Sequence, residues 1–226
     1  MIEQSSIEHH IQKHIMGVLI HRKVARFRDL RPPKTDTNLF SYHLKTMLKS
    51  GFIAKQDGGY TLSHYGLAYA DRVSIKKLNI RTQPKIITMT ALFDSNGQVL
   101  LQKRSKQPYI DTWTLPYGKL HIDDATIEAA ALREVKEKLD IEPASLNHVG
   151  DCYIRVVADG STLSSTLAHV FTTRYDLVAL PDDARWVNVE MFDSLDLAPA
   201  VDKIVRVIQQ SPARFFLELS ENWIDE

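Results

Sequence analysis

Two glutamates three residues apart, Glu134 and Glu137, are the side chains whose type and spacing most directly suggest chemistry. On an α-helix they would lie side by side on one face, where two like charges destabilise an isolated helix by ~0.2–0.5 kcal/mol. A divalent cation would turn that repulsion into coordination, because hard carboxylate oxygens are the ligands that Mg²⁺ or Mn²⁺ selects. The pair therefore indicates a metal site, and the alternative is a solvated acidic helix face.

The residues around this pair extend the pattern. The segment 118–141 resembles the signature of the Nudix hydrolase family, Gly-x5-Glu-x7-Arg-Glu-U-x-Glu-Glu-x-Gly-U, in which U is a bulky apolar residue. The matching positions are Gly118, Arg133, Glu134, Val135, Glu137 and Ile141. The neighbouring segments are similar to family motifs as well: 99–104 to the second strand, 113–119 to the Trp-x-x-Pro-Gly-Gly-Lys lead-in, and 185–190 to the closing Trp-Val strand.

The segment also departs from the signature. One residue too many separates Gly118 from Arg133, so the first Glu of the pattern falls on Asp124 or, counting back from Arg133, on Ala125. The second Glu of the Glu-Glu pair is Lys138, and the later Gly is missing. In the family that second Glu is usually a metal ligand. A lysine there removes one negative charge and adds a positive one, which disfavours a nearby cation by Coulomb repulsion.

The resemblance implies a reaction and a set of site residues. Family chemistry is the attack of water on a diphosphate that links a nucleoside to another group, with Mg²⁺ or Mn²⁺ neutralising the phosphate charge. It implies Glu134 and Glu137 as metal ligands and proton acceptors, Gly118 as a backbone carbonyl ligand, and Arg133 as the residue that orients the catalytic loop. Three basic side chains are expected to bind substrate phosphates, with solvent exposure as the alternative for each: Lys103, Arg104 and Lys119.

The segment before residue 79 predicts a separate winged helix-turn-helix domain. Apolar spacing indicates helices over about 5–20 and 26–30, and a third helix that starts after Asp36 and ends at Gly51. A hairpin around 57–59 and a helix from Ser63 to about Lys77 complete the pattern. The run 40–55 resembles the recognition helix and first wing strand of bacterial winged-helix regulators of the ArsR or MarR type.

A winged helix of this kind would contact double-stranded DNA. Lysine and tyrosine on the recognition helix could meet phosphates and base edges in a major groove, and a palindromic site would be read by a homodimer. The candidate residues are Ser41, Tyr42, Lys45, Lys49 and Lys55. The alternative is a module for dimerisation or protein contacts.

The second half predicts an α/β fold. Strands are expected at 85–93, 99–103, 147–157, 167–175 and 185–189, with long helices from Asp124 or Thr126 and over 198–210. This alternation, together with the resemblance, implies a Nudix-like α/β/α sandwich with a mixed sheet. The predicted organisation is a winged helix-turn-helix domain at 1–78, a linker at 79–84 and a Nudix-like domain at 85–226.

Charge and composition constrain the partners. The net charge of the 226 residues is zero, but residues 1–80 hold 13 Lys and Arg against 6 Asp and Glu, a charge of +7, and the rest carries −7. The basic part has the sign that nucleic acid requires, and the acidic part suits metal–nucleotide chemistry. A single cysteine, Cys152, excludes an internal disulfide and fits a cytoplasmic setting. No apolar run approaches the ~20 residues of a membrane span, so no membrane partner is expected.

Two functions fit these observations. The leading hypothesis is a Nudix-type hydrolase of a nucleoside diphosphate derivative, fused to a DNA-binding winged helix. The alternative is a transcription regulator whose Nudix-like domain senses a nucleotide metabolite such as ADP-ribose without hydrolysing it. The retained Glu134 and Glu137 favour the enzyme, whereas Lys138 and the missing first Glu favour the sensor.

Overall fold

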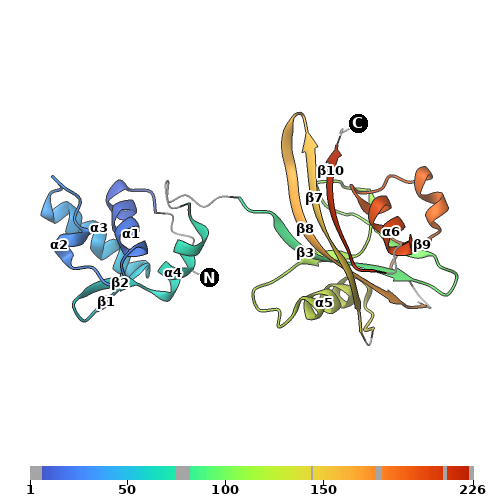
Figure 1. The fold of residues 1–226 in the computed structure, drawn as a ribbon, viewed down its shortest axis with the longest axis horizontal. Coiled ribbons are helices and arrows are strands. Elements are labelled where there is room, and N and C mark those ends of the chain that lie inside the picture. Colours follow the sequence, from blue (N-terminus) through green and yellow to red (C-terminus); the bar gives the residue numbers. More distant parts are fainter. Residues whose placement is uncertain (1–6, 75–81, 144, 177–179, 211–212, 224–226) are drawn as a thin grey trace. The chain divides into compact units, whose positions relative to one another are not determined.

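The chain divides into two compact units, Met1–Thr82 and Gln83–Glu226 (Figure 1). The computed structural model describes residues 7–74, 82–143, 145–176, 180–210 and 213–223. Each unit has its own hydrophobic core and is described by itself.

Over its described residues, unit 1 consists of three helices, a hairpin and a fourth helix. In chain order these are α1 (His10–Ile20), α2 (Phe27–Leu30), α3 (Thr37–Lys49), the antiparallel strands β1 (Ile53–Gln56) and β2 (Gly59–Leu62), and α4 (His64–Arg72). Ile15, Phe40 and Met47 are among the side chains buried between them. The predicted order of elements is confirmed, and the identity of the unit as a winged helix stays a prediction.

Local signals set the ends of the unit 1 helices. The Asp36 carboxylate caps α3 by accepting hydrogen bonds from the backbone N–H groups of Asn38 and Leu39, at 2.8 and 2.9 Å. Gly51 ends α3 with a φ of +76°, a conformation that glycine adopts without strain. The first helix is shorter than predicted, because α1 begins at His10, and residues 5–6 of that prediction lie outside the described residues. The helix predicted to reach Lys77 ends at Arg72, and its last part, 75–77, also lies outside them.

Unit 2 is built on a mixed eight-stranded sheet in the order β10-β7-β8-β3-β4-β5, with β6 beside β3 and β9 beside β4. β10 and β3 run parallel to β7 and β8 respectively, and the other pairs are antiparallel. The strands are β3 (Lys85–Phe93), β4 (Val99–Lys103), β5 (Trp113–Thr114), β6 (Tyr117–Lys119), β7 (Asn147–Ala158), β8 (Ser161–Arg174), β9 (Ala184–Val187) and β10 (Phe215–Asn222).

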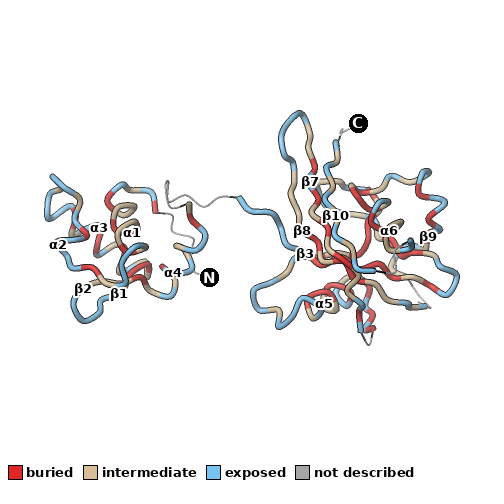
Figure 2. Tube along the Cα trace, in the orientation of Figure 1, coloured by how far each residue is buried: buried red, intermediate tan, exposed pale blue. Residues whose placement is uncertain are grey.

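Helices pack against both faces of this sheet. On one face α6 (Val201–Gln210) and the short 3₁₀ helix η1 (Val189–Ser194) cover side chains such as Met89 and Val170. On the other face α5 (Ile127–Leu139) packs on Leu92 and Phe171. Figure 2 shows the buried residues gathered in the central strands and the helix faces that meet them. The predicted α/β/α sandwich with a mixed sheet is confirmed.

Some elements of unit 2 differ from the prediction. β10 was not predicted, β8 begins at Ser161 instead of 167, and the last long helix begins at Val201 instead of 198. The end of the predicted strand 185–189 is instead the start of η1 at Val189. Within the described residues, none of the helices is both long and apolar enough to cross a membrane.

Candidate active site

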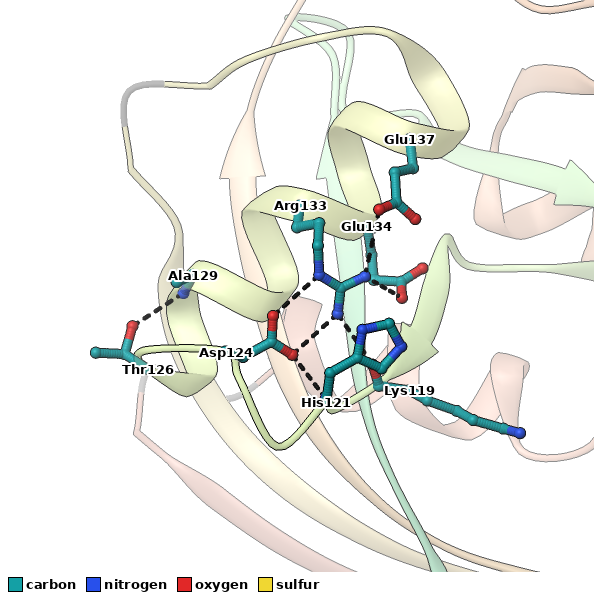
Figure 3. A network of polar contacts seen from close by, with 8 residues as sticks. All are labelled: Lys119, His121, Asp124, Thr126, Ala129, Arg133, Glu134 and Glu137. Atoms are coloured by element: carbon teal, nitrogen blue, oxygen red, sulfur yellow. Dashed lines mark hydrogen bonds and ion pairs between the residues drawn. The ribbon is translucent and has the colours of Figure 1, made fainter. Parts of the chain in front are cut away.

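Arg133 is the centre of a polar network between α5 and the preceding loop (Figure 3). Its Nε and Nη2 lie 3.0 Å from the two carboxylate oxygens of Asp124. Its Nη1 lies 2.8 Å from Glu134 Oε1 and 3.5 Å from Glu137 Oε1. Nη2 also donates to the Lys119 carbonyl at 3.1 Å. One guanidinium therefore pairs with three carboxylates and ties the loop to the helix.

Asp124, one of the two positions on which the signature's first Glu falls, is the loop carboxylate that pairs with Arg133. Hydrogen bonds from Arg133 and from the His121 backbone N–H lower the pKa of Asp124 to about 2. The same pairing with Asp124, and with Glu134, raises the pKa of Arg133. The helix itself begins after Thr126, whose hydroxyl accepts from the Ala129 N–H at 3.0 Å. The segment 118–141, which resembles the family signature, is called the Nudix box below. Its extra residue thus lies between the Asp124 carboxylate and Arg133, where the loop accommodates it.

The Glu134 carboxylate lies directly against the backbone of Gly118 on β6. Glu134 is 9% exposed. A Cβ added to Gly118 would lie 1.6 Å from Glu134 Cδ and within 2.0 Å of both carboxylate oxygens. Only glycine leaves room for the carboxylate here. The Glu137 side chain, by contrast, is 58% exposed, so one glutamate is fixed in a cradle and the other reaches solvent.

The donor set fits one hard divalent cation. Glu134 and Glu137 offer carboxylate oxygens from one helix, and the Gly118 backbone adjoins the Glu134 carboxylate. Taken with Asp124, Arg133 and Lys138, the cluster carries a formal charge of −1. Mg²⁺ is commonly bound by one or two carboxylates and completes its shell with water and substrate phosphates. A single cation of that kind suits this site better than a closed cage of protein ligands.

A basic pocket of about 180 Å³ is lined by Tyr117 and Lys138, which are the sequence neighbours of Gly118 and Glu137. Lys138 lines it from α5, and its Nζ lies 5.7 Å from the centre of the Tyr117 ring. The full set of lining residues is Gln102, Lys103, Arg104, Ser105, Lys106, Thr114, Tyr117, Lys138 and Asp183. The lysine that replaces the signature's second Glu therefore contributes positive charge to a pocket that already holds three other cations.

A second, more apolar pocket of about 100 Å³ shares Arg104, Thr114 and Tyr117 with the basic one. Tyr109 also lines it, and its hydroxyl lies 2.9 Å from Ser164 Oγ. Burial raises the pKa of Tyr109, which favours the neutral hydroxyl. The two adjacent pockets offer a charged compartment and an aromatic one.

The three predicted phosphate-binding residues have different surroundings. Lys103 lines the basic pocket and pairs with Asp111 at 3.2 Å. Arg104 lines both pockets, but its guanidinium donates to the carbonyls of the following loop and to the Tyr117 hydroxyl. The Lys119 side chain lines a different pocket and points away from Arg133 in Figure 3. The structure thus brings Lys103 and Arg104 together, without Lys119, and uses most of the Arg104 donors to order the loop.

The predicted DNA-contacting residues lie on α3 and β1 of unit 1. Tyr42, Lys45 and Lys49 are exposed at helical spacing on one face of α3, and Tyr42 is 64% exposed. Ser41 is half-buried beside them, and Lys55 is exposed on β1. The helix therefore presents two lysines and a tyrosine to solvent on one face.

A polar cluster on β7 and β8 was missed by sequence reasoning. Asp151 Oδ1 lies 3.0 Å from His148 Nε2 and 2.7 Å from His169 Nδ1. Sequence spacing gives little signal for it, because His148 and Asp151 are three apart on a strand and a regular strand would place them on opposite faces. His169 joins them only through the strand pairing.

The family model of the NUDIX domain matches residues 83–208, more than half of the chain, and the chain therefore belongs to the Nudix family. This match lies entirely within unit 2. Among solved structures, the chain is similar to the NUDIX domain of Shewanella oneidensis NrtR complexed with ADP ribose, with a TM-score of 0.50 and 18% identity over 64% of this chain and 96% of that one. It is also similar to the MutT protein from Bacillus halodurans, with a TM-score of 0.50 and 17% identity over 60% and 89% of the two chains. At these identities the likeness shows a shared fold. No curated protein matched the sequence.

Proposed function

We propose that unit 2 hydrolyses the diphosphate of a nucleoside diphosphate derivative, using a divalent cation held by Glu134 and Glu137. The observation that carries this proposal is the position of Glu134: its buried carboxylate lies in a cradle that only Gly118 allows, and Arg133 pairs with it and with Glu137. A solvated acidic helix face would need neither the cradle nor the shared arginine. A cytoplasmic setting is part of this proposal.

In this reaction each residue of the network has a separate task. A bound Mg²⁺ or Mn²⁺ would neutralise phosphate charge and lower the pKa of the attacking water. Glu134 and Glu137 would hold it, and either carboxylate would accept the proton that the water loses. Arg133 holds both carboxylates in place, and its pairing with Asp124 fixes the loop that follows Gly118.

The two pockets suit the two ends of a nucleotide. Lys138, Lys103 and Lys106 line the basic pocket, where they would neutralise the diphosphate. Tyr109 and Tyr117 line the adjacent pocket, where a base or a ribose could pack on their rings. The similar NrtR domain was crystallised with ADP ribose, a compound with both features, and this supports testing that ligand first.

The test is product release from a panel of ADP-ribose, NAD, dinucleoside polyphosphates and nucleoside triphosphates, with Mg²⁺ and with Mn²⁺. The variants are Glu134→Gln and, as a matched control, Glu142→Gln, which removes an exposed carboxylate paired with Lys136 outside the network. Turnover of one compound that is lost in Glu134→Gln and kept in the control supports the proposal. Equal turnover in both variants, or none in the wild type, contradicts it.

A second candidate is a regulator that binds a nucleotide without hydrolysing it and binds DNA through unit 1. Two observations favour it: Lys138 supplies a cation where the family signature has a carboxylate, and α3 presents Tyr42, Lys45 and Lys49 on one exposed face. This candidate expects saturable nucleotide binding with no product. It also expects unit 1 to bind DNA. The salt dependence of that binding is the slope of log K against log [salt]. The magnitude of this slope should decrease by about one for each lysine removed, in Lys45→Ala or in Lys49→Ala. Arg72→Ala on α4 is the control.

A further inference from the structure

The β7–β8 hairpin carries a compact set of nitrogen and oxygen donors away from the Nudix box. His148 Nε2 and His169 Nδ1 both lie within hydrogen-bond distance of the same carboxylate oxygen, Asp151 Oδ1. One ligand atom from each residue lies within 4.8 Å of the other two. The side chains are 28%, 18% and 34% exposed for His148, His169 and Asp151, so an ion from solvent can reach them.

A β-bulge brings the three side chains together. The pairing of β7 with β8 shifts between His148, opposite Phe171, and Gly150, opposite Val170. The extra residue, Val149, turns His148 onto the face of Asp151, although residues three apart on a regular strand face opposite ways. Asp151 is directly opposite His169 in the register. Bulges that re-aim a side chain are typical of functional positions.

We propose that His148, Asp151 and His169 form a binding site for a first-row transition-metal ion such as Zn²⁺. Two imidazoles and one carboxylate are a known ligand set for Zn²⁺ with an open fourth position. Tetrahedral Zn²⁺ with nitrogen ligands at 2.0–2.1 Å requires ligand atoms about 3.3 Å apart. The observed 3.0 and 2.7 Å need only a small rotation of the side chains to open to that value. In each neutral ring the proton that points at Asp151 moves to the other nitrogen when the metal binds.

This site is separate from the Nudix box, although both lie on the α5 side of the sheet. Asp151, His169, Thr88 and Gly118 are successive register partners across β7, β8, β3 and β6. At ~4.8 Å per strand, His169 is therefore about 10 Å from the glycine that cradles Glu134. The donor types also differ, since imidazole suits Zn²⁺ and the oxygen donors of the box suit Mg²⁺. The inference does not depend on hydrolysis by the box.

The test is equilibrium dialysis of the full chain against Zn²⁺ in the presence of excess Mg²⁺, with metal content measured by mass spectrometry. We expect one Zn²⁺ per chain. His148→Ala and His169→Ala should each raise the dissociation constant by more than ~100-fold, since loss of an outer-shell partner alone commonly costs 10–100-fold. Glu134→Gln should leave the affinity unchanged, because the box is a different site.

Two further controls make the result unambiguous. Unit 1 holds a second group of imidazoles, His9, His10 and His43, whose ring centres lie 4.4 and 3.8 Å apart, so His9→Ala should also leave Zn²⁺ binding unchanged. If His169→Ala does not fold, His148→Asn at the bulge decides in its place, with folding checked by circular dichroism. Absence of saturable Zn²⁺ binding in the wild type overturns the proposal. So does binding that persists in the β7–β8 variants or that is lost in His9→Ala.

Discussion

Substituting Gly118 by alanine tests whether the position of the Glu134 carboxylate is what the site requires. The new Cβ would lie 1.6 Å from Glu134 Cδ, and 1.8 and 2.0 Å from its two oxygens, so the carboxylate must leave its cradle. The atoms in the way are the far end of a flexible side chain, which can rotate toward solvent. We therefore expect Gly118→Ala to fold while it separates Glu134 from Arg133.

The magnitudes follow from the contacts that change. The 2.8 Å ion pair of Glu134 with Arg133 is a charge-assisted contact worth ~1.5–3 kcal/mol. Replacing a glycine within a strand by alanine stabilises the fold by ~0.5–1 kcal/mol. The net loss of about 0.5–2.5 kcal/mol corresponds to a fall in the unfolding temperature of unit 2 by roughly 2–8 °C. Loss of a metal ligand should cost far more in function, with kcat/KM falling by at least ~100-fold, or ~2.7 kcal/mol of transition-state stabilisation.

The assay compares Gly118→Ala with Gly97→Ala. Gly97 has a φ of +79° in the turn between β3 and β4, and a Cβ there would meet nothing within 4 Å. A side chain in that conformation costs ~1–2 kcal/mol, so the control is matched in stability but leaves Glu134 alone. Mn²⁺ binding and turnover of ADP-ribose are measured for both, along with thermal unfolding. Wild-type Mn²⁺ affinity in Gly118→Ala would refute the reasoning, as would an equal loss in Gly97→Ala.

Three other predictions rest on single side chains. In the folded chain Arg133 lowers the pKa of Asp124 from 3.8 to about 2, so as the pH falls the Asp124 carboxylate is protonated first in the unfolded chain. The stability that this pair contributes is therefore present above pH ~4 and is lost as the pH falls toward 2. Asp124→Asn should therefore flatten the acid dependence of denaturant unfolding between pH 4 and 2, and an unchanged slope would contradict the pairing. Lys138→Glu should raise Mn²⁺ affinity by about tenfold or more, measured by titration; a lower affinity would show that Lys138 supports the site as it stands. Burial raises the pKa of the Cys152 thiol to about 12, so alkylation at pH 8 should proceed only as unit 2 unfolds, and rapid labelling of the native protein would count against that burial.

The parts of the fold with a strong local signal were predictable from the sequence. The strands at 85–93 and 99–103 have the predicted ends, because both are rich in apolar and β-branched residues and a turn sequence separates them. Thr126 was one of the two predicted starts of α5, and its hydroxyl caps the helix. β10 was not predictable in the same way. Exposed and half-buried residues alternate along this strand, so it has no buried apolar face that would indicate it. Its partner β7 is some sixty residues away in the sequence, so the strand forms through non-local pairing.

The candidate site also has parts that were predictable from the sequence and parts that were not. Glu134, Glu137 and Arg133 share one helix, and helical spacing alone predicts that they are neighbours. The direction of the Arg104 side chain depends instead on the loop that follows it, whose carbonyls accept its hydrogen bonds. The His169 contact with Asp151 depends on strand register and on a bulge. Neither of these features has a signature in the order of residue types.

The charge around α5 decides how the two candidate functions would differ in practice. With Lys138 the box cluster carries −1, and a glutamate in its place would bring it to −3. With Mg²⁺ bound, the present cluster therefore has a net charge of +1, which attracts a diphosphate. The glutamate variant with Mg²⁺ bound would have a net charge of −1. Lys138→Glu should thus move cation and nucleotide affinity in opposite directions, strengthening the first and weakening the second. If turnover rises although the nucleotide binds less tightly, the cation is the limiting component of an enzyme. If nucleotide binding is lost and no turnover appears, Lys138 belongs to a ligand pocket, and the regulator becomes the better account of this chain.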